Sequence, residues 1–130
     1  MSFGPTRTAR VTVRAPIDSV WEYITNLDNR TEWRHVLSRI PTFDHDSART
    51  GMALGRGAYL TAWRPKVEFA LGDKNGSHFD RFQLQPLDKE STSLTLSCTF
   101  NLMAWMMFWE LEDDVRGFAN RAKAAIERRQ

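Results

Sequence analysis

The first third of the chain changes from a strand pattern to a helix pattern. From Thr8 to Arg14, apolar and polar side chains alternate, and this alternation predicts a half-buried strand. Pro16 then favours the first turn of a helix, where its missing N–H group is not needed. The apolar positions from Ile17 to Ile24 recur with a helical period, and Asn26–Arg34 predicts a loop and a second short helix.

Five segments with strand patterns follow, and turn residues separate them. The predicted strands are Val36–Asp44, Leu54–Arg64, Lys66–Leu71, Ser77–Leu87 and Ser91–Leu102. Pro41 cannot donate a ladder hydrogen bond, so the first of these is expected to be an edge strand or a bulged one. The polar stretch 45–51 predicts a turn, and the Gly-Asp-Lys-Asn-Gly run at 72–76 predicts a hairpin turn.

One long helix is predicted at the C-terminal end, from Trp105 to Arg128. Its apolar stripe consists of Leu111, Val115, Phe118, Ala119, Ala122 and Ile126. Acidic residues gather near its start and basic residues near its end, which complements the helix dipole and explains these charge runs without a partner. The order of the elements predicts one α+β domain over residues 1–130.

Composition argues against several classes of protein. Lys and Arg number 18 against 16 Asp and Glu, and they are scattered, so the net charge of +2 does not predict nucleic-acid binding. The single cysteine, Cys98, permits no intrachain disulfide and is expected to be an inert buried thiol. The longest apolar run, Leu102–Trp109, is too short to span a bilayer, and no signal-peptide pattern opens the sequence. We therefore expect a cytoplasmic protein without a membrane span.

The segment RVTVRAPIDSVWEYITNLDNRTEWRHVLSRI, together with the strands and the long helix after it, resembles the START-like (SRPBCC) superfamily and, within it, the polyketide cyclase/dehydrase group. The positions that carry the resemblance are Ala15-Pro16, Val20-Trp21, Asp28 and Trp33. The resemblance implies a helix-grip fold. In this fold a curved antiparallel sheet of six or seven strands wraps around the C-terminal helix, two short helices follow the first strand, and a cavity holds an apolar molecule.

The number of strands is where the sequence departs from that superfamily. Seven strands are usual there, whereas the pattern here gives six. Either the stretch 45–51 replaces a hairpin or Met52–Trp63 merges two strands, and the sequence leaves both open. The rival fold is the cone-shaped NTF2-like barrel, but its chains usually end in strands, and the C-terminal helix favours the helix grip.

Candidate catalytic chemistry is sparse. No motif for a metal, a phosphate group or a nucleophile is present, and His35, His45 and His78 lie far apart, so we expect no metal and no cofactor. On a strand, His78 and Asp80 share the face of Phe82, and in a cavity they could act as an oriented general base. The alternative is that both are solvated near the hairpin turn.

Aromatic side chains are abundant, with five Trp and eight Phe residues, and such side chains line apolar cavities as well as cores. The candidate ligand-binding residues are Trp33, Tyr59, Trp63, Phe82, Phe100, Trp105 and Trp109. Their alternative role is ordinary core packing. The segment Asn101–Trp109 joins the last strand to the long helix, and its two tryptophans are expected to share a helix face and close one end of the cavity.

The sequence leaves three functions open. The first is binding of a small hydrophobic polyketide-, terpenoid- or lipid-like molecule, which the resemblance implies. Many members of that superfamily only bind or carry ligands, so promotion of cyclisation, dehydration or isomerisation rests also on the polar pair His78 and Asp80, which would move protons. The second is a non-catalytic carrier or sensor of an apolar ligand. The third is an interaction module that uses Leu102–Trp109 as an exposed apolar patch. A small apolar ligand is the expected partner, nucleic acid is not, and a homodimer is left open.

Overall fold

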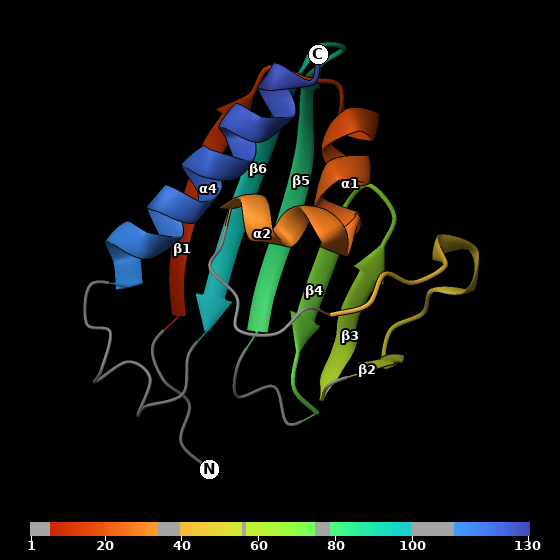
Figure 1. Cartoon of the computed structure of the whole chain (residues 1–130). Coiled ribbons are helices and arrows are strands. Elements are labelled where there is room, and N and C mark those ends of the chain that lie inside the picture. Colours follow the sequence, from red (N-terminus) through yellow and green to blue (C-terminus); the bar gives the residue numbers. More distant parts are fainter. Residues whose placement is uncertain (1–5, 34–39, 56, 75–78, 100–110) are drawn as a thin grey trace.

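The computed structural model of the protein describes residues 6–33, 40–55, 57–74, 79–99 and 111–130. Its strands are β1 (Thr6–Val13), β2 (Ala53–Gly55), β3 (Ala58–Arg64), β4 (Glu68–Gly72), β5 (Phe79–Asp88) and β6 (Ser91–Thr99). Its helices are α1 (Ile17–Thr25), α2 (Arg30–Trp33) and α4 (Leu111–Arg128), with 3₁₀ turns η1 (Leu27–Asn29) and η2 (His45–Ser47). The helices lie over one face of the sheet (Figure 1).

The strands form one curved antiparallel sheet in the order β1-β6-β5-β4-β3-β2. Helix α4 runs along the β1 and β6 side, whereas α1 and α2 cover the neighbouring strands (Figure 1). This arrangement confirms the α+β helix-grip fold that the sequence predicted. Among the described residues, no helix combines the length and the apolar character needed to cross a membrane.

The core lies between the sheet and α4 and follows from the predicted alternation. On β6, Leu94, Leu96 and Cys98 are fully buried, and Leu96 sits opposite Phe82 on β5 in the ladder. Cys98 is therefore a buried thiol, as expected. Successive strand residues point to opposite faces, so every second residue of β5 and β6 faces the helices.

The face that α4 turns to the sheet is built largely from small side chains. Val115, Ala119, Ala122, Ala125 and Ile126 are all buried, and three of these five are alanines. An alanine lets the helix backbone approach the strands closely, because it adds only one methyl group between them. The predicted apolar stripe is thus confirmed over the part of α4 whose side chains are described.

The strand predicted at Val36–Asp44 is wrong in its described part, because Ile40–Asp44 is irregular and forms no ladder. Residues 36–39 lie outside the described residues. Pro41 lacks a ladder donor, and Phe43 instead packs its ring against Trp63, with 5.4 Å between ring centroids. The apolar residues of this segment therefore serve side-chain packing and not strand pairing.

The segment predicted as one strand at Leu54–Arg64 is a hairpin of β2 and β3. Gly55 and Gly57 adopt positive φ values of 98° and 77°, which the turn requires and which a side chain would disfavour. The sheet therefore has six strands in the described residues, but they are not the six expected. The strand predicted at Lys66–Leu71 begins later, at Glu68, and Val67 lies exposed in the turn before it.

Shortening a buried side chain of β6 should lower the stability of the fold, whereas shortening a solvated leucine should not. We expect Leu96→Ala to lower the free energy of unfolding by about 2–5 kcal/mol, because Leu96 is fully buried between β1, β5 and α4. The matched control Leu87→Ala, at a residue 52% exposed, should change it by less than about 0.5 kcal/mol. Urea unfolding checks both, and equal losses would contradict this placement of the core.

Candidate functional site

Aromatic rings form a continuous layer on the inner face of the sheet. The ring centroids of Trp33 and Phe82 lie 5.3 Å apart, and Phe82 stacks on Phe69 at 6.4 Å. Phe69 in turn packs against Trp63 at 5.9 Å, and Trp63 against Trp21 at 5.1 Å. The layer thus extends from α2 across β5, β4 and β3 to α1. Trp33, Phe82 and Phe69 are each 3% exposed or less, so the layer forms an apolar wall within the core.

Trp33 joins this layer to the C-terminal helix. Its indole ring contacts Phe82 on one side and Phe118 of α4 on the other, the latter at 6.1 Å between centroids. Its carbonyl oxygen accepts a hydrogen bond of 3.2 Å from Nε of Arg121, also on α4. Trp33 is 3% exposed, so this candidate ligand residue lies at the meeting point of α2, α4 and the sheet.

One ion pair interrupts the apolar surface. Nη2 of Arg30 on α2 donates to Oδ2 of Asp80 on β5 at 2.8 Å, and the side chains are 14% and 3% exposed. The sequence predicted that Asp80 shares the inner face with Phe82 and Leu84, and both of these are buried. The alternative, in which Asp80 is solvated, is wrong. His78 lies outside the described residues, so its pairing with Asp80 stays a prediction.

Arg30 is the site residue that sequence reasoning missed. It stands 50 residues from Asp80 along the chain, and a lone arginine in a short helix looks like an ordinary surface charge. Its buried Nε has no hydrogen-bond partner among the described residues. A signal existed nevertheless, because Arg30 and Trp33 are three apart and therefore share a helix face.

The other candidate residues divide into two groups. Trp63 belongs to the aromatic layer, whereas Tyr59 precedes Leu60, which is fully buried on the inner face, so Tyr59 points to the opposite face. The structure therefore does not bring Tyr59 together with the others. Phe100, Trp105 and Trp109 lie outside the described residues, as does the expected closure of the cavity by the two tryptophans.

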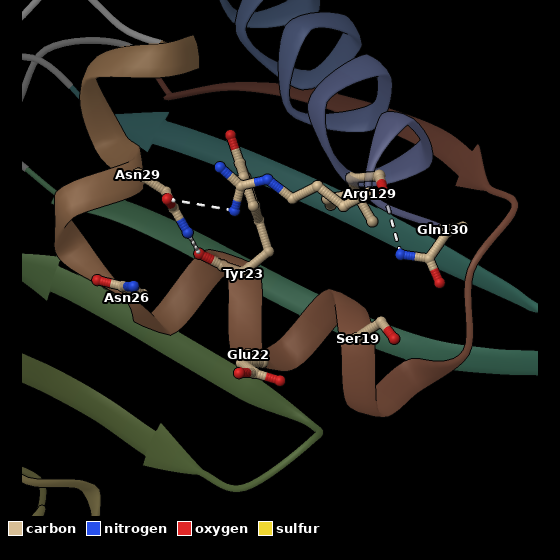
Figure 2. Close-up of a pocket in the computed structure, with 8 residues that line it drawn as sticks. Ser19, Glu22, Tyr23, Asn26, Asn29, Arg129 and Gln130 are labelled. Carbon is tan, nitrogen blue, oxygen red and sulfur yellow. Dashed lines mark hydrogen bonds between the residues drawn. The ribbon is translucent and has the colours of Figure 1, made fainter.

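A separate polar pocket of about 240 Å³ lies between α1 and the C-terminal end of α4. Figure 2 shows Ser19, Glu22 and Tyr23 along α1, with Arg129 and Gln130 across from them. Its lining is mostly polar, with Ile126 as the apolar exception. This pocket is not the apolar cavity that the sequence predicted between sheet and helix.

The wall of this pocket is a hydrogen-bonded junction of helices. The Tyr23 hydroxyl donates to Glu32 at 2.9 Å, and Nη2 of Arg129 donates to the same carboxylate at 2.9 and 3.1 Å. The Arg129 guanidinium also lies 4.9 Å from the centroid of the Tyr23 ring. Burial, and then the hydrogen bond to Glu32, raise the pKa of Tyr23, so its phenol stays protonated as the donor. The network ties α4 to α1 and α2.

Side chains of the kinds that bind metals are dispersed in the part of the chain that the structure describes. No three His, Cys, Asp or Glu side chains gather there closely enough to hold a metal ion. His45 instead packs its ring against Phe43 and Trp63, at 5.2 and 5.3 Å between centroids.

No family model matches this sequence, and no curated protein matches it. Among solved structures, 113 chains match. Protein MLL2253 from Mesorhizobium loti has a TM-score of 0.69 and 13% identity, over 97% of this chain and 99% of that one. Zhui aromatase/cyclase from Streptomyces sp. R1128 has a TM-score of 0.62 and 16% identity, over 96% and 94%. The Polyketide_cyc-like protein Cgl2372 from Corynebacterium glutamicum has a TM-score of 0.55 and 19% identity, over 93% and 82%.

At such identities the likeness concerns the fold. The neighbours include proteins named as polyketide cyclase-like and aromatase/cyclase, and they share the helix-grip fold that the sequence resemblance implied.

Breaking the buried ion pair Arg30–Asp80 should lower the stability of the fold far more than breaking an exposed ion pair. We expect Asp80→Asn to lower the free energy of unfolding by about 3–5 kcal/mol, because it leaves the Arg30 charge buried without its counter-ion. The control Asp18→Asn breaks the pair with Lys66, whose side chains are 72% and 54% exposed, and should cost less than about 1 kcal/mol. Chemical denaturation measures both, and similar losses would show that the Arg30–Asp80 pair is effectively solvated.

Proposed function

We propose that the protein binds a small apolar molecule between the inner face of the sheet and the helices that cover it. The observation that carries this proposal is the aromatic layer around Trp33, which joins the sheet to α2 and α4. Apolar pockets with a few polar groups are the usual sites for small ligands. The layer offers the apolar surface, and the Arg30–Asp80 pair is the polar group beside it.

The class of ligand is proposed by analogy with the fold. Two structural neighbours are named as an aromatase/cyclase and a polyketide cyclase-like protein. A flat polyketide-like molecule suits an aromatic layer, because ring faces stack on one another with little loss of conformational freedom. Terpenoid- and lipid-like molecules would use the same surface through dispersion contacts alone. The ligand is therefore a hydrophobic molecule of one of these three kinds.

Catalysis is the second candidate, and the inward position of Asp80 is the observation that favours it. In that case the site would promote cyclisation, dehydration or isomerisation of the bound molecule, mainly by holding it in a reactive shape. Asp80, with His78, would move protons. The non-catalytic carrier needs no proton transfer. Turnover that is unchanged in both His78→Ala and Asp80→Ala would remove these two residues from the mechanism.

The neutral fluorescent probe 1-aminoanthracene tests ligand binding. We expect saturable binding with one probe per chain, a blue shift of its emission in the apolar site, and a rise in Tm with probe concentration. Trp33→Ala should weaken binding about tenfold or more, because Trp33 contacts both walls of the site.

Tyr59→Ala provides the control, because Tyr59 points to the opposite face of the sheet. This variant should bind 1-aminoanthracene with the same affinity as the wild-type protein. Circular dichroism verifies that both variants fold. Absence of saturable binding, or equal weakening in the two variants, would contradict the proposed site.

A further inference from the structure

The geometry points to Arg30 as the polar anchor of the ligand, with its buried Nε–H donating to a neutral carbonyl oxygen on an otherwise apolar molecule. This inference rests on the proposed function and adds the chemical class of the ligand: an aromatic or polycyclic molecule with a ketone, an aldehyde or an ester group. Asp80 is the positioning residue that holds the guanidinium in place.

One N–H donor of the Arg30 guanidinium finds no acceptor in the part of the chain that the structure describes. A guanidinium has five N–H donors in a rigid planar fork, and one Nη2 donor is used by Asp80 at 2.8 Å. The Nε atom is buried and has no acceptor among the described residues. Buried donors are nearly always paired in folded proteins, and one that is not requires an explanation. A ligand oxygen is an acceptor that would satisfy it.

The polar anchor and the aromatic wall beside it come from the same two elements, α2 and β5. Arg30 and Trp33 are three apart on α2 and share a helix face, while Asp80 and Phe82 are two apart on β5 and share a strand face. Both contacts are formed, the ion pair at 2.8 Å and the ring pair at 5.3 Å between centroids. A donor therefore lies next to a flat apolar surface, which suits a flat molecule with one oxygen.

The opposite charges of Arg30 and Asp80 cancel, so an anionic ligand would bring a net negative charge into a buried place beside a carboxylate. Burying an uncompensated charge is costly, whereas a carbonyl oxygen accepts from a charged donor without adding one. The pair therefore favours a neutral carbonyl over a carboxylate of the same size.

Three probes of equal shape test the anchor through displacement of 1-aminoanthracene. They are 2-acetylnaphthalene, which carries the carbonyl, the hydrocarbon 2-isopropenylnaphthalene, and 2-naphthoate, which carries a carboxylate. We expect the wild-type protein to bind the ketone about tenfold or more tighter than the hydrocarbon, since a hydrogen bond from a charged donor is worth that much. The ketone should also bind tighter than the carboxylate.

The variant Arg30→Lys keeps the charge that faces Asp80 but removes Nε–H. It should bring the ketone and the hydrocarbon to nearly equal affinity, mainly by weakening the binding of the ketone. The control is Arg81→Lys, because Arg81 follows Asp80 on β5 but lies on the opposite face beside Glu68. This control should preserve the preference for the ketone.

The outcomes separate the anchor from the proposed function. Equal affinities of ketone and hydrocarbon for the wild-type protein would overturn the anchor and leave apolar binding intact. That comparison needs no variant, so it holds even if Arg30→Lys folds poorly. If 2-naphthoate binds most tightly of the three probes, the inference that the ligand carries a neutral carbonyl group is overturned. If neither neutral probe displaces 1-aminoanthracene, the anchor is overturned. If 1-aminoanthracene itself shows no saturable binding, the proposed function fails, and the anchor fails with it.

Discussion

A six-stranded sheet is wider than one helix can cover, and this mismatch determines where the short helices and the aromatic rings lie. Six strands span about 24 Å across the sheet, whereas a helix with its side chains is about 10 Å in diameter. Helix α4 uses its alanines to sit close over β1 and β6 (Figure 1). The other half of the inner face must be covered by something else, and aromatic rings with the short helices α1 and α2 do so. The proposed ligand site lies along that second half.

Helix α2 is too short to be stable alone, so contacts on both of its sides must hold it. On its inner side, Arg30 pairs with Asp80 and Trp33 packs on Phe82. Elsewhere on the same helix, Glu32 accepts hydrogen bonds from Tyr23 and Arg129. The polar pocket of Figure 2 is thus explained as part of the junction that positions α2, and with it the anchor and the aromatic wall.

Much of the fold could be predicted from the sequence because it depends on local periodicity. The alternation in β1, β5 and β6 and the stripe of α4 gave the right elements, and the period of two gave the inward direction of Asp80. The strand prediction was wrong at Ile40–Asp44, because Phe43 packs its ring against Trp63 and no strand pairs with this segment. The sequence left the division of Met52–Trp63 into two strands as one of two alternatives, because only backbone angles such as those of Gly55 and Gly57 distinguish a bent strand from a turn.

The candidate site was harder to predict than the fold. Its central contact joins Arg30 to Asp80 across 50 residues of chain, and no local pattern reports such a pair. Tyr59 was selected for its residue type, but the neighbouring burial of Leu60 turns it to the far face. Residue type alone therefore identified the aromatic wall at Trp33, Trp63 and Phe82, but it could not identify the polar group beside that wall.

The position of a bound ligand tests the central claim most directly. Intermolecular nuclear Overhauser effects from 2-acetylnaphthalene to assigned side-chain protons would give that position without any variant. Our account predicts contacts from the naphthalene ring to Trp33 and Phe82, and from the acetyl methyl group to the side chain of Arg30. Contacts to Tyr23 and Ile126, which line the polar pocket, with none to Trp33 or Phe82, would contradict it.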